Sequence, residues 1–158
     1  MFRELARKKQ ALSAEECTNI LKSEKRGVLS VNGDEGYPYG MPMNHWYNEE
    51  DGKLCFHCGT IGHRLDALKK NNKASFCVYD TGYCRPGEWA RHINSVIVFG
   101  TVEIVDDLDR IIDITRKLSY KFTSDDDYIE REIKHYAKQT VLLVLTPEHI
   151  CGKRVQES

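Results

Sequence analysis

The sequence predicts a mostly β protein: a β-barrel of about six antiparallel strands with three to four flanking helices. Apolar segments of strand length follow one another through short turns, and helices do not alternate with strands as in a doubly wound parallel sheet. A long apolar segment, 95–105, carries Gly100 near its middle, which indicates the bulge or bend that curls a sheet. We see no internal repeat or linker, so residues 1–158 are expected to form one domain.

Composition sets limits on partners and location. The formal net charge of −1 gives no reason to expect nucleic acid or an anionic membrane as a partner. No apolar segment approaches the roughly 20 residues of a membrane span, and the charged N-terminus does not have the pattern of a signal peptide. A cytoplasmic protein is therefore expected.

The first third of the chain reads as a helix followed by a β-hairpin. Ser13 and Glu16 have the spacing of a capping box, and Gly27 is expected to end the helix. Residues 27–31 alternate as a strand does. Asn32-Gly33 then opens a turn into the next strand.

The central stretch carries most of the candidate chemistry. It is expected to form a strand, a turn, a second strand, a glycine-flanked loop and a helix (37–47, 48–52, 53–58, 59–62 and 63–70). Ile61, Leu65 and Leu68 are expected to share the buried face of that helix, and Asn71 to end it.

The remaining strands and helices follow in order. Strands are expected at 74–79, 95–105 and 140–145, the last ending before Pro147, and residues 80–93 read as a long loop of the kind that often carries function. Helices are expected after Asp106 or Asp107 and after the acidic segment 124–127. That acidic segment has two interpretations, a charged helix cap and a cation site.

The six cysteines are Cys17, Cys55, Cys58, Cys77, Cys84 and Cys151. Cys55, His57 and Cys58 suggest a metal site, but a zinc ribbon needs a second such pair, and Cys55 and Cys58 would face opposite sides of a strand. Reduced, packing cysteines are the alternative, and we predict no metal.

An anion site is predicted where the central helix begins. Gly62 precedes His63 and Arg64, so free backbone N–H groups, the helix dipole and two basic side chains would converge on one point. The alternative is a solvated basic helix start, which the dipole disfavours.

The segment Met41, Pro42, Met43, Asn44 is unusual for a strand. Pro42 cannot donate to a neighbouring strand, so it indicates an edge or a bulge. Two methionines and an asparagine beside it could form a soft wall with polar handles, suited to a planar heterocycle. The alternative is a twisted strand with methionine as core filler.

Taken together, these residues resemble the pyridoxamine 5′-phosphate oxidase-like FMN-binding split-barrel family, in its nitroimidazole-resistance (Nim-like) branch. The matching segments run in the same order over nearly the whole chain: 36–39, 42–44, 56–57, 62–64, 95–105 and 150–153.

The resemblance implies a homodimer with FMN at the subunit interface. It places residues 41–44 along the isoalloxazine ring, His57 and Cys58 near the phosphate or ribityl chain, and Gly62, His63 and Arg64 at the phosphate. It also makes Trp89 a residue that approaches the flavin of the partner subunit.

The expected function is that of a flavoprotein oxidoreductase that passes electrons from NAD(P)H through FMN to a small aromatic or nitro compound. His45 is a candidate for orienting the acceptor. The oxidase proper has an arginine where this chain has Met41, so oxidation of pyridoxamine phosphate is not expected. The alternatives are a non-enzymatic flavin- or heme-binding protein and an F420-dependent reductase.

Overall fold

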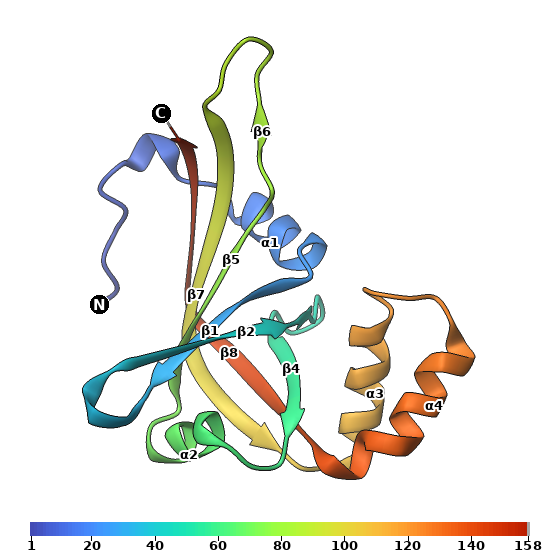
Figure 1. Ribbon diagram of the computed structural model, residues 1–158. Coiled ribbons are helices and arrows are strands. Elements are labelled where there is room, and N and C mark those ends of the chain that lie inside the picture. Colours follow the sequence, from blue (N-terminus) through green and yellow to red (C-terminus); the bar gives the residue numbers. More distant parts are fainter. Residues whose placement is uncertain (158) are drawn as a thin grey trace.

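The computed structural model describes residues 1–157, and its centre is one antiparallel sheet of eight strands (Figure 1). The strands are β1 Arg26–Asn32, β2 Pro38–Asn44, β3 Trp46–Tyr47, β4 Leu54–Gly59, β5 Lys73–Tyr79, β6 Tyr83–Cys84, β7 Arg91–Val105 and β8 Thr140–Glu157. Seven of them lie in the order β2-β1-β5-β7-β8-β4-β3, and β6 pairs with β7. Because β2 and β4 approach each other from opposite ends of that order, the sheet curls into a half-barrel.

Four α-helices flank the sheet: α1 Ala14–Ser23, α2 His63–Lys70, α3 Leu108–Ser119 and α4 Asp126–Tyr136. The main core lies on the concave face and includes Leu21, Leu29, Phe56 and Phe76. A smaller cluster lies between the other face of β4 and β8 and helix α3. The predicted mostly β class is confirmed. The structure has two more strands than expected because two-residue strands, β3 and β6, form in segments read as strand and loop.

Helix α1 begins as its capping box predicts. The Oγ of Ser13 accepts from the N–H of Glu16 at 3.1 Å, and Glu16 Oε2 accepts from the N–H of Ser13 at 2.8 Å. The helix ends at Ser23, so the predicted end at Gly27 is wrong. Gly27 instead lies within β1, where an added Cβ would be 2.4 Å from Cζ of Phe76, so that the ring occupies the space a side chain would need.

Helix α2 begins at His63 and is capped at its C-terminus by Asn71, as predicted. Leu65 and Leu68 are buried, but Ile61 precedes the helix and is 91% exposed, so its expected place on the buried face is wrong. Helices α3 and α4 start at aspartate caps, Asp107 and Asp125. The acidic segment is thus accounted for as a helix cap.

The predicted end of the last strand before Pro147 is wrong, because β8 continues to Glu157. Phe99 pairs with His149 and Gly100 with Pro147, so Glu148 is an extra residue on β8 opposite the glycine. A proline is tolerated at such a bulge because the strand pairing is already interrupted there.

The expected loop 80–93 is largely a β-hairpin. Tyr83 pairs with His92, and Cys84 pairs with Arg91. Strand β7 therefore starts at Arg91, four residues before the apolar segment that begins at Ser95. Asp80 fixes the base of the hairpin, since its two oxygens accept from the backbone N–H and the Nδ2 of Asn94 at 2.9 and 2.7 Å.

Candidate functional site

Strand β2 forms one edge of the sheet, with β1 as its only partner in the described strand order. Met41 and Met43 point into the core, whereas Pro42 is exposed and Asn44 is half-buried. The methionines are therefore core residues, as the alternative interpretation had it. The outer edge of β2 still offers unpaired backbone groups to a ligand.

Arg64 lies where β2, β4 and α2 meet. Its Nη1 is 3.2 Å from Sδ of Met43, and its guanidinium also contacts the thiol of Cys58. Burial raises the pKa of the Cys58 thiol, and the Arg64 cation opposes that shift in part. Within residues 1–157 no carboxylate forms an ion pair with Arg64, and its side-chain partners there are the sulfur atoms of Met43 and Cys58.

The N-terminus of α2 is open beside this arginine. Gly62 is the N-cap, at φ +130°, and no atom lies within 4 Å of the place where a Cβ would stand. The cap has no side-chain hydrogen bond, so the first N–H groups of the helix remain available to an acceptor. An anion could approach this helix start, and the anion site stays a prediction.

His63 is occupied by other contacts. Its Nε2 lies 3.3 Å from Oδ2 of Asp34, and its ring stacks on Tyr39 at 4.3 Å between centroids. Lys70 donates to Oδ1 of the same aspartate at 3.0 Å. The hydrogen bond and charge of Lys70, together with His63, lower the pKa of Asp34. Sequence analysis did not find Asp34, because only the fold brings the β1–β2 turn next to α2.

His57 and Cys58 occupy opposite faces of β4. Cys58 packs against the main core, and both residues line a pocket of about 490 Å³ between the end of β4 and helices α3 and α4. Its side chain reaches solvent, yet burial by the surrounding walls lowers its pKa. The imidazole is thus neutral at pH 7.

His45 has no exposed surface. Its Nε2 donates to the carbonyl oxygen of Leu21 at 2.8 Å, and burial, followed by the charge of Lys121, lowers its pKa to about 4. This geometry favours a structural role over the expected contact with an electron acceptor. Trp89, by contrast, is 80% exposed in the tip of the β6–β7 hairpin, where a second molecule could reach it.

The cysteines do not form a metal site in the part of the chain that the structure describes. Cys55 packs against α3 while Cys58 faces the main core, and no group of three or more His, Cys, Asp or Glu side chains is arranged to hold a metal ion there. The described residues also include no helix long and apolar enough to cross a membrane.

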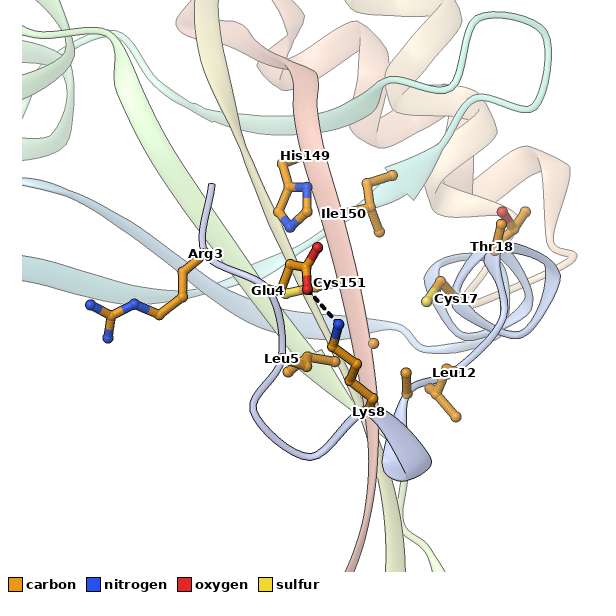
Figure 2. Close-up of a pocket in the computed structure, with 13 residues that line it drawn as sticks. Arg3, Glu4, Leu5, Lys8, Leu12, Cys17, Thr18, His149, Ile150 and Cys151 are labelled. Atoms are coloured by element: carbon orange, nitrogen blue, oxygen red, sulfur yellow. Dashed lines mark ion pairs between the residues drawn. The ribbon is translucent and has the colours of Figure 1, made fainter. Parts of the chain in front are cut away.

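A separate hollow of about 540 Å³ lies between the N-terminal segment, α1 and β8 (Figure 2). The ion pair between Lys8 and Glu4, at 2.8 Å, lies in it, and His149 and Cys151 also line it. None of the predicted site residues lines this hollow.

The fold and the cluster at α2 define a half-barrel protein with an open, basic helix start at the edge of its sheet. A family model described as pyridoxamine 5′-phosphate oxidase matches residues 13–154, and the chain belongs to that family. A search of curated protein sequences gives no match.

Solved structures share the fold. One is a candidate 5-nitroimidazole antibiotic resistance protein from Bacteroides thetaiotaomicron, 18% identical, with a TM-score of 0.77 over 92% of this chain and 87% of that one. Another is an FAD-binding protein from Mesorhizobium loti, 22% identical, with a TM-score of 0.67 over 92% and 97%. A third is an F420 reductase, 19% identical, with a TM-score of 0.61 over 87% and 98%.

Proposed function

We propose that the protein binds FMN at the junction of β2 and α2 and is an oxidoreductase that passes electrons from NAD(P)H to a small aromatic or nitro compound. The observation that carries this proposal is Arg64, a cation without a carboxylate partner in residues 1–157, beside the open N-terminus of α2. A phosphate there would gain a charged hydrogen bond from the guanidinium and further bonds from backbone N–H groups.

The residues around this point fit the rest of the cofactor. Gly62 lets an anion approach the backbone closely, because no side chain stands in its way. The unpaired edge of β2 at Pro42 and Asn44 offers backbone groups and an amide to the polar rim of a flat ring. Bound flavin would supply the hydride and electron transfer, while these residues hold and orient it.

The comparisons support a flavin-type cofactor but do not distinguish FMN from FAD or F420. The fold is shared with an FAD-binding protein and with an F420 reductase, so FAD and F420 are the alternatives to FMN. FMN is favoured because Arg64 and the open start of α2 converge on one small site, which suits a single terminal phosphate.

We further propose a homodimer. The outer face of the sheet carries an apolar row in which Val28, Cys77, Ile97 and Cys151 follow one another across β1, β5, β7 and β8. These side chains are exposed or half-buried, and contiguous apolar surface of this kind marks an interface. Light scattering on the eluting protein should give twice the chain mass; a monomer at micromolar concentration would contradict this part of the proposal.

An absorbance spectrum of the purified protein tests the cofactor, followed by mass spectrometry of what is released on denaturation. FMN at about one per chain supports the proposal. A colourless protein that does not take up added FMN overturns it. Turnover of NAD(P)H with a nitroaromatic acceptor then tests the enzyme, and FMN binding without turnover leaves a flavin-binding protein that is not an oxidoreductase.

A further inference from the structure

The pocket beside His57 adjoins the proposed phosphate site, because Cys58, whose thiol contacts Arg64, also lines the pocket. Its floor is the last rung of the β4–β8 ladder, where Gly59 pairs with Thr140, and its walls are α3 and α4, which stand beside β4 in Figure 1. Its volume of about 490 Å³ is in the range of small-molecule sites. Arg64 does not line it, and no other arginine or lysine does.

Aromatic and apolar groups form one wall. Tyr128, Ile133, Tyr136 and Ala137 all project from α4 or from the turn that follows it. The two tyrosines are about half exposed, so their rings are available to stack on a flat ligand.

Hydrogen-bonding groups come from β4 and α3. His57 presents an imidazole whose burial-lowered pKa keeps it neutral at pH 7. Thr115, on α3, has a buried Oγ1 without a hydrogen-bond partner among the described residues. An unpaired buried hydroxyl is unfavourable, and a hydrogen-bonding ligand would relieve it after a small shift of the lining.

The only formal charge on the lining is negative. Glu132 is half-buried and has no ion-pair partner within residues 1–157. Since neither lysine nor arginine lines the pocket, an anion such as a phosphate or a carboxylate would be repelled. A cation or an N–H donor would gain a partner instead.

We infer that this pocket binds a small planar aromatic compound with a protonated or N–H-donating nitrogen. The ring lies against the tyrosines of α4, and the nitrogen points to Glu132. The site shares one lining residue, Cys58, with the cluster around Arg64, but neither α3 nor α4 contributes to the junction of β2 and α2.

The test uses benzamidine as the cationic probe, with benzoate as its anionic counterpart of the same shape. Ligand-detected NMR gives affinities at pH 7 for the purified protein, with and without added FMN. We expect benzamidine to bind in both states and benzoate not to bind. Absence of benzamidine binding, or equal binding of both probes, would overturn the inference, whatever the outcome of the flavin tests.

Variants localise the binding. Glu132→Gln should weaken benzamidine binding by about fivefold, the upper range for a charge pair at the protein surface. Asp127→Asn removes the same charge from the same helix outside the pocket and should leave affinity unchanged. Ala137→Phe should fill the pocket and abolish binding. If Ala137→Phe does not fold, the pair of charge variants still decides, since equal effects of Glu132→Gln and Asp127→Asn would place the ligand elsewhere.

Discussion

The Nε2 of His45 lies 2.8 Å from the carbonyl oxygen of Leu21, within the core. Nε2 must carry the proton that it donates, so Nδ1 is the unprotonated nitrogen, and this atom is buried without a partner in the described structure. Protonating Nδ1 would create a buried cation beside the ring of Phe76, at 4.9 Å between centroids. The neutral histidine therefore joins α1 to the segment between β2 and β3.

Acid should destabilise the protein through His45. Its pKa is about 4 when folded against an ordinary 6.5, so the unfolded chain binds the extra proton between these values and stability falls as the pH decreases through them. The expected loss is about 3 kcal/mol. His45→Gln keeps a donor for Leu21 but does not titrate, so denaturant unfolding from pH 7 to 4 should show a flatter profile, whereas exposed His135→Gln should match the wild type. Parallel profiles for all three proteins would rule this explanation out.

Lys121 should lower the pKa of His45. Its Nζ donates to the carbonyl oxygen of Glu24 at 2.6 Å, burial lowers its pKa to about 8, and its charge is the second cause of the low pKa of His45. Lys121→Met should therefore raise the pKa of His45 in an NMR titration of labelled histidine, while exposed Lys134→Met should not. An unchanged His45 titration in Lys121→Met would leave burial as the sole cause.

The bulge should depend on Gly100. A Cβ there would stand 2.0 Å from the carbonyl oxygen of Thr146, whereas a Cβ on Gly59 would meet no atom within 4 Å. Gly100→Ala should cost about 2 kcal/mol or more of unfolding free energy, and Gly59→Ala about 0.5 kcal/mol or less. Thermal and denaturant unfolding of the two variants measures the contrast. Similar stability of both would mean that the strands shift freely at the bulge.

Local chemistry made much of the fold predictable. The capping box at Ser13, the turn at Asn32-Gly33 and the bend at Gly100 are each encoded within a few residues, and each lies where the sequence predicts. Pro147 was misread because its tolerance depends on the bulge opposite it, on another strand. The hairpin at 80–93 escaped prediction because its pairing does not depend on apolar alternation.

The candidate site was predictable only in part. Gly62 and Arg64 adjoin in sequence, so a helix start with a basic side chain could be foreseen. The contact of Arg64 with Met43 and the pairing of His63 with Asp34 join residues at least 21 positions apart, which local patterns cannot show. Nor does the sequence reveal that His57 faces away from them, because that depends on which side of β4 the core lies.

Arg64 should carry most of the affinity for FMN. Arg64→Ala removes the cation at the start of α2 and should weaken FMN binding by about tenfold or more, the range for a hydrogen bond to a charged group. Lys69→Ala removes a cation from the same helix at its far end and should have little effect. Fluorescence quenching during FMN titration gives both dissociation constants. Equal dissociation constants for the two variants would mean that the FMN phosphate does not bind at Arg64.

Asp34 should restrain the same site. It holds His63 at 3.3 Å and Lys70 at 3.0 Å, so part of the positive charge beside α2 is neutralised before any phosphate arrives. Asp34→Asn should release both and tighten FMN binding about two- to fivefold, the scale of an exposed ion pair. Asp51→Asn removes an aspartate paired with Lys53 in the β3–β4 turn and controls for net charge. If both substitutions tighten FMN binding equally, the gain is a long-range charge effect and neither His63 nor Lys70 takes part in the site. Only a gain confined to Asp34→Asn assigns the cations released from Asp34 to the phosphate.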